Sequence, residues 1–217
     1  MRNLLMIVFL ALVPAFLGAQ SDAATEKPSA QVSMVARAGV SQTPYHVFEV
    51  WKTNPKGWIF PDIGVVSFGN PSEYREFFAG FGKVLVANDK IVVVGELYYL
   101  QADGSASDDA KYVQPWILGI YNFTKTVRFE GTYFPYLPLD DAGTTQHVLE
   151  RAKVEKVLGQ WKVGAGYSGY QFGDGPWQDK PFVTGTYTTK GGLSSEVWLQ
   201  SLPHGKRQVQ LRFFANF

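Results

Sequence analysis

The chain of 217 residues carries 20 basic and 19 acidic side chains, so its formal net charge is +1. A charge this small gives no broad electrostatic field that would favour binding of nucleic acid or of metal ions. Hydrophobic residues make up 46% of it and aromatic residues 15%, a composition that excludes intrinsic disorder, collagen and coiled coil. Because the sequence contains no cysteine, a disulfide scaffold and a thiolate metal site are also excluded. We therefore expect no cofactor, no metal site and no nucleic-acid partner.

The first 23 residues have the pattern of a secretory signal peptide. A short cationic start, Met1-Arg2-Asn3, precedes an apolar run, and small residues then allow cleavage after Ala19 or Ala23. The apolar run of about 14 residues is shorter than the ~20 that a spanning helix needs. An uncleaved N-terminal anchor is the alternative. Residues 24–30 are small and polar and predict a flexible leader.

Residues 31–217 repeat one pattern, in which runs rich in Val, Ile, Tyr, Phe, Trp and Thr are separated by turn residues. The predicted strands are Gln31–Val40, Tyr45–Thr53, Trp58–Phe68, Tyr74–Val86, Ile91–Gln101, Tyr112–Phe123, Thr126–Leu137, Gln146–Val157, Trp161–Phe172, Phe182–Lys190, Ser194–Leu202 and Gln208–Phe217. A repeat of about 15–16 residues suits membrane strands of ~9–11 residues joined by turns. Twelve strands are expected, with ten as the alternative, and residues 144–157 would also form a helix because charge falls on both strand faces.

The predicted connections fall into two alternating sets. One set is long and mostly acidic, and it includes residues 103–109, 139–144 and 173–179, whereas the other is short and carries Lys56, Lys90 and Lys125. Long loops on one side and tight turns on the other are typical of outer-membrane barrels.

Aromatic residues cluster near the predicted strand ends. Those beside the short turns are Trp51, Trp58, Phe123 and Trp161, and those near the long loops are Tyr133, Phe134, Tyr136, Tyr170 and Phe172. Two aromatic girdles at the levels of the lipid headgroups would produce this pattern.

The last ten residues alternate clearly between apolar and polar. One face of this strand would carry Val209, Leu211, Phe213, Ala215 and Phe217, and the other is largely polar. The ending resembles the C-terminal assembly signal of bacterial outer-membrane β-barrel proteins, in which a terminal aromatic follows alternate hydrophobic positions. Ala215 departs from that signal, which often has an aromatic there.

The resemblance implies an all-β fold, a closed antiparallel transmembrane β-barrel over residues 31–217, in the bacterial outer membrane. It also implies outer-membrane lipid and lipopolysaccharide as partners, together with the barrel-assembly machinery through the last strand. A soluble lipocalin-like or periplasmic barrel is the alternative. An outward row of large apolar side chains is stable in lipid, whereas in water it would form a large exposed patch.

Charged side chains in the strands should point inward, because an Arg or Lys facing lipid at mid-depth costs roughly 2–4 kcal/mol. The residues expected to line the lumen are Glu96, Arg128, Glu130, Lys162, Glu196 and Arg212. Twelve strands lie between small filled barrels and wide porins. By strand count the chain is similar to the twelve-stranded nucleoside-channel and oligosaccharide-channel families.

These features predict a narrow channel for the passive passage of small solutes. A structural or surface-adhesion barrel with a sealed lumen is the alternative, since inward charges of both signs could pair across the interior. A lipid-modifying enzyme is a third class, but His147 and Glu150 would lie on opposite faces of a strand and could not cooperate. We therefore expect no catalytic residues.

Overall fold

The computed structural model describes residues 30–40, 45–69, 73–104, 109–202 and 205–217, so the predicted signal peptide and most of the predicted leader lie outside it. The strands are β1 (Gln31–Val40), β2 (Tyr45–Thr53), β3 (Trp58–Phe68), β4 (Arg75–Ala87), β5 (Ile91–Asp103), β6 (Lys111–Asn122), β7 (Val127–Pro138), β8 (Gln146–Leu158), β9 (Trp161–Phe172), β10 (Gln178–Thr188), β11 (Ser194–Ser201) and β12 (Arg207–Asn216). The described residues contain no helix long and apolar enough to cross a membrane.

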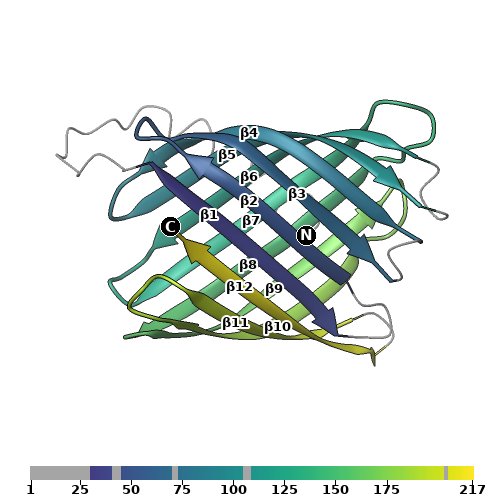
Figure 1. The fold of residues 1–217 in the computed structure, drawn as a ribbon. Helices are drawn as coiled ribbons and strands as arrows, with labels where there is room; N and C mark the ends of the chain where they lie inside the picture. The colour runs from purple at the N-terminus through teal and green to yellow at the C-terminus, as the bar shows by residue number, and fades with distance from the viewer. Residues whose placement is uncertain (1–29, 41–44, 70–72, 105–108, 203–204) are drawn as a thin grey trace.

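Each strand pairs antiparallel with its sequence neighbours, and β1 pairs with β12 to close the ring (Figure 1). At this seam Ala36 lies opposite Phe213 and Gly39 opposite Gln210. Closure leaves no strand edge unpaired, which is the condition for a sheet that spans lipid. The prediction of a closed antiparallel barrel with twelve strands is confirmed, and residues 146–158 form a strand rather than a helix.

Strand β10 differs from the prediction, because it begins four residues earlier and ends at Thr188. Gln178 already pairs with Tyr170 of β9, so the ladder extends into the predicted loop. At its other end Thr189 closes the turn: its backbone N–H donates to the Leu193 carbonyl at 2.8 Å, and its hydroxyl accepts from the Leu193 N–H at 3.2 Å.

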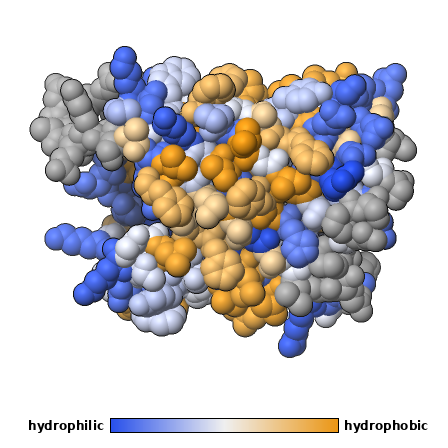
Figure 2. All heavy atoms as spheres, viewed as in Figure 1, coloured by the Kyte–Doolittle hydropathy of each residue, from blue (hydrophilic) through white to orange (hydrophobic). Residues whose placement is uncertain are grey.

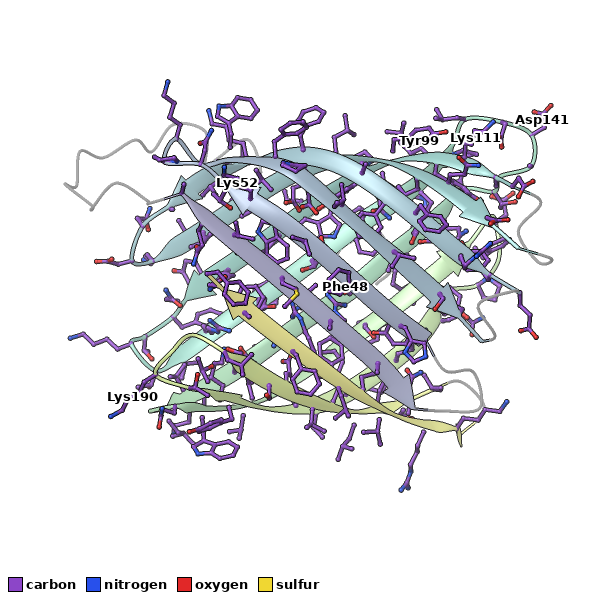
Figure 3. All side chains as sticks on the ribbon, viewed as in Figure 1. Phe48, Lys52, Tyr99, Lys111, Asp141 and Lys190 are labelled. Carbon is purple, nitrogen blue, oxygen red and sulfur yellow. The ribbon has the colours of Figure 1, made fainter. Side chains whose placement is uncertain are left out.

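The outer surface carries a belt of exposed apolar side chains between two hydrophilic ends (Figure 2). Phe48, Phe81 and Leu199 are among the exposed residues of this belt, and each alternates with an inward neighbour. Figure 3 shows Phe48 in the middle of the barrel wall, with Lys52 and Lys190 toward the short-turn end and Asp141 toward the long-loop end. The belt is the arrangement expected of a sheet whose outer face meets lipid.

The last strand follows its predicted alternation. Val209, Phe213 and Phe217 are exposed on the outer face, whereas Ala215 is buried there. Phe214, an aromatic on the otherwise polar face, packs against Trp51 of β2 with ring centroids 5.8 Å apart. This contact places Trp51 inside the barrel and not in the predicted girdle, whereas Trp58, Phe123 and Trp161 are exposed.

A closed ladder of this kind should resist detergent. We expect the protein, extracted from membranes without heating, to migrate differently in SDS gel electrophoresis from the boiled sample, because the unboiled barrel keeps its compact form. Identical mobility before and after boiling, for protein that is folded by circular dichroism, would contradict a detergent-resistant barrel.

Two β-bulges change which side chains face the interior. In β3 the register shifts between Ile59 and Asp62, and both residues are buried although they are three apart. In β8 it shifts between Leu149 and Ala152, and the adjacent residues Glu150 and Arg151 both reach the interior, where Glu150 pairs with Arg37 of β1 and Arg151 is buried. A bulge inserts one residue and so changes the face on which the neighbouring side chains lie. Across these two bulges, Asp62 lies inside as Ile59 does, and Glu150 lies inside as Arg151 does.

Candidate solute pathway

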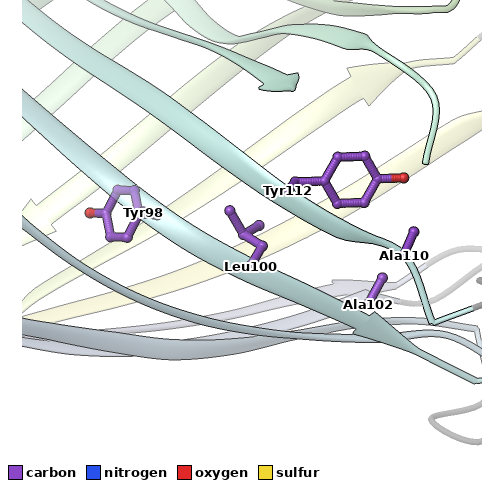
Figure 4. Close-up of a cluster of buried hydrophobic side chains, with 5 residues drawn as sticks. All are labelled: Tyr98, Leu100, Ala102, Ala110 and Tyr112. Carbon is purple, nitrogen blue, oxygen red and sulfur yellow. The ribbon is translucent and has the colours of Figure 1, made fainter. Parts of the chain in front are cut away.

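The barrel interior holds a cavity of about 760 Å³ at the long-loop end. Its lining includes Tyr45 at the start of β2, Phe68 at the end of β3 and Phe172 at the end of β9, all of which adjoin long-loop connections. The wall beside it contains a buried cluster made of Tyr98, Leu100 and Ala102 from β5, Tyr112 from β6, and Ala110, which immediately precedes β6 (Figure 4).

Aromatic side chains near the long loops line this cavity. Phe134, Tyr136 and Tyr170 were predicted to form an outer girdle, but all three are among its lining residues. Tyr136 packs edge-on against buried Tyr112, with ring centroids 5.5 Å apart. The prediction was wrong for these residues because closeness to a strand end does not determine the face on which a side chain lies.

Deeper in the barrel, ionic side chains form a charged layer made of Arg37, Arg128, Glu130, Glu150, Arg151, Lys153, Glu155, Glu196 and Arg212. Lys153 is its centre: the ammonium lies 2.8 Å from Glu155 Oε1 and 2.6 Å from Glu196 Oε1. Lys153 and Glu155 are buried, and Glu196 also accepts a hydrogen bond from the Thr184 hydroxyl. Paired and hydrogen-bonded in this way, the charges can be held away from bulk water.

The charged layer crosses the barrel interior. Arg37 on β1 forms an ion pair with Glu150 on β8, and these strands are five positions apart around the ring. Glu150 is also paired with Arg151 at 2.8 Å, and Arg151 with Glu130 of β7 at 2.8 Å. Arg37 and Glu150 both line the cavity, so their ion pair forms part of its floor.

The structure brings four of the six predicted lumen residues into ion pairs. Arg128 lies 3.3 Å from Glu130, and Arg212 lies 3.6 Å from Glu196. Lys162 alternates with exposed Trp161 and Val163 and so lies on the inner face of β9. Neither Lys162 nor Glu96 belongs to an ion pair among the described residues.

A group of acidic residues occupies the wall formed by β2 to β5: Glu49, Asp62, Glu76 and Glu96. Tyr98 on β5 donates a hydrogen bond of 2.9 Å to Asp62 on β3, and it reaches across β4 at Gly80. A Cβ at Gly80 would lie only 2.5 Å from the Tyr98 ring and 2.5 Å from the Leu97 carbonyl oxygen. Glycine at position 80 of β4 therefore leaves the space in which Tyr98 of β5 reaches Asp62 of β3.

The interior charged residues that sequence reasoning missed include Arg37, Glu49, Asp62, Glu76, Glu150, Arg151, Lys153, Glu155 and Lys180. For Lys153 and Glu155 a signal was present, since they alternate with exposed Val154 and Lys156. For Asp62 and Glu150 the alternation is interrupted by a bulge, which the sequence pattern does not mark.

His147 and Glu150 do not contact each other in the structure. The His147 ring nitrogen Nδ1 lies 2.7 Å from the Tyr133 hydroxyl, whereas Glu150 faces the cavity and pairs with arginines. His46 is exposed, and His204 lies outside the described residues. In the same ranges, no group of three or more His, Asp or Glu side chains is placed to hold a metal ion.

Solved structures with a similar fold include two porins. The KdgM porin matches with a TM-score of 0.63 at 11% sequence identity, covering 85% of this chain and 99% of its own. The NanC porin matches with a TM-score of 0.58 at 11% identity, covering 85% of this chain and 98% of its own. No protein-family model and no curated protein sequence matches the chain. The likeness supports the fold alone, that of a closed transmembrane β-barrel with twelve strands.

Proposed function

We propose that this protein is a narrow outer-membrane channel for the passive passage of small solutes. The observation that carries the proposal is the charged interior: a cavity of about 760 Å³ leads down to a layer of charged side chains, while a belt of exposed apolar side chains covers the outer face. Rings of charged side chains are a common way to select solutes in a pore. Passage of this kind needs no catalytic group.

The proposed orientation places the short-turn end in the periplasm and the long loops outside the cell. The partners are then outer-membrane lipid around the belt, lipopolysaccharide near the long loops, and the barrel-assembly machinery at β12. The exposed Val209, Phe213 and Phe217 of the last strand support contact with such machinery.

Single-channel recording in planar bilayers tests the channel. Purified, refolded protein should give discrete conductance steps, and Arg37→Ala should increase their size severalfold, because it removes the side chain that crosses from β1 to β8. Glu150 keeps Arg151 as a partner in this variant, so the fold should survive. Lys83→Ala is the control, since Lys83 lies outside, over the Trp58 ring at 5.1 Å, and should leave conductance unchanged.

A sealed structural barrel is the second candidate, and the charged layer is the observation that favours it. The layer crosses the interior, and its central residues Arg151, Lys153 and Glu155 are buried. If heat-modifiable, correctly folded protein leaves bilayers sealed, and Arg37→Ala leaves them sealed too, the structural function replaces the channel.

A further inference from the structure

Two oppositely charged side chains face the cavity from opposite walls. Glu76 is the second residue of β4, Lys180 is the third residue of β10, and both line the cavity. These strands are six positions apart in a ring of twelve, so they stand on opposite sides of the barrel. Both residues are near the long-loop ends of their strands, which places them at the same end of the barrel.

Glu76 has no cation partner within the described ranges. It is 3% exposed, and it accepts a hydrogen bond of 3.1 Å from Tyr136 and another from Tyr74. Glu49 lines the same cavity from β2, but it interacts electrostatically with Arg37 of β1. Buried carboxylates in proteins are normally paired, so Glu76 is the carboxylate of this wall that lacks a partner of opposite charge. An ammonium group brought by a ligand would supply the missing partner.

The wall around Lys180 is positive. Its ammonium lies over the Tyr170 ring, 4.2 Å from the centroid, and it has no carboxylate within 4 Å in the described part of the chain. Arg207 lines the same cavity, whereas the amide N–H groups of Gln200 and Gln210 already donate to oxygens of neighbouring residues. A carboxylate is the group that such a wall binds.

The space between these walls is lined by aromatic rings, which include Phe78, Trp116 and Trp198. Its volume of about 760 Å³ is within the range of small-molecule sites. The cavity thus offers an anionic wall, an apolar centre and a cationic wall in sequence.

We propose that the cavity binds zwitterionic small solutes with an apolar body, such as short peptides, with the ammonium toward Glu76 and the carboxylate toward Lys180. The proposal rests on the proposed function in so far as it names the class of solute that the channel passes. Binding itself requires only the cavity, so the two can fail separately.

Calorimetric titration of the folded barrel in detergent micelles tests this proposal with three matched probes. Leucyl-glycine carries both charges at neutral pH, N-acetyl-leucyl-glycine carries only the negative one, and leucyl-glycinamide only the positive one. Neutralising either end of the peptide removes one charge-assisted hydrogen bond and should weaken binding roughly tenfold or more. We therefore expect leucyl-glycine to bind at least that much more tightly than either analogue.

Two variants assign the ends of the ligand. Glu76→Gln keeps the tyrosine contacts, and this variant should bind leucyl-glycine and N-acetyl-leucyl-glycine with the same affinity. Lys180→Gln should bind leucyl-glycine and leucyl-glycinamide with the same affinity. Lys83→Gln, on the outer face, should retain the full preference. Heat-modifiable gel mobility establishes that each variant is folded, and either variant alone suffices for the test.

Equal binding of the three probes to the unmodified protein, or binding of none, overturns the zwitterion site. So does a preference that both variants leave unchanged. If the protein gives conductance steps but does not bind leucyl-glycine, the zwitterion site is wrong and the channel proposal stands. If the protein binds leucyl-glycine but does not conduct, the site stands and the channel proposal is wrong.

Discussion

Replacing Lys153 by alanine is expected to lower the free energy of unfolding by about 3–5 kcal/mol, the cost typical of breaking a buried ion pair. Lys153 lies within 4 Å of three carboxylates, those of Glu130, Glu155 and Glu196. Its removal leaves Glu155 paired with Arg128, and it leaves Arg212, at 3.6 Å, as the remaining ion-pair partner of Glu196 among the described residues. Urea unfolding of the barrel in phospholipid vesicles, followed by tryptophan fluorescence, measures the change.

Two further variants separate the effect of charge from the effect of packing. Lys83→Ala removes an exposed lysine on the outer face and should change the free energy of unfolding little. Combining Lys153→Met with Glu155→Gln removes one charge of each sign, leaves Arg128 with Glu130 and Arg212 with Glu196, and should restore much of the stability. A Lys153→Ala variant as stable as Lys83→Ala would show that the charged layer contributes little to folding.

Introducing arginine at Leu97 is expected to destabilise the barrel by roughly 2–4 kcal/mol, the cost of a cation facing lipid at mid-depth. Leu97 is 40% exposed and lies in the middle of β5, between inward Glu96 and Tyr98. Its partner on β4 is Phe81, which is also exposed. Unfolding in vesicles again gives the magnitude.

Leu85→Arg is the matched control for depth. Leu85 is likewise exposed, but it lies two residues from the end of β4 at the short turn, where an arginine side chain can reach the headgroups. The expected cost there is roughly 0–1 kcal/mol. Equal costs at Leu97 and Leu85 would argue against a lipid belt centred on the middle of the strands.

The strand pattern was predictable because a barrel wall is simple in one respect: each strand alternates between lipid and interior. In the last strand this rule placed Val209 and Phe213 outside and Gln208 on the other face. An even number of strands joined by alternating long loops and short turns makes the first and last strands antiparallel, so that they can pair and close the barrel. The exact ends of β10 did not follow, because they depend on pairing with β9 and on the Thr189 turn.

The site was harder to predict, and β8 shows why. Regular alternation places its charges on both strand faces, a pattern that a helix also permits. In the structure, the bulge between Leu149 and Ala152 brings Glu150 and Arg151 both to the interior, where one pairs with Arg37 and the other with Glu130. Contacts across the ring are set by three-dimensional closure, and no local spacing encodes them.

The seam between β1 and β12 has a consequence for how the molecule is made. Ser33 donates to Asn216, 183 residues away, and Val32 exchanges backbone hydrogen bonds with Phe217 at 3.1 and 2.8 Å. Until that junction forms, the sheet is open and has two unpaired edge strands, each of which can pair with a strand of another molecule. Contacts so distant in sequence form slowly. The unfinished barrel must therefore be kept apart from other copies of the chain until β12 is in place. The pairing of β1 with β12 then removes the free strand edges through which copies could associate.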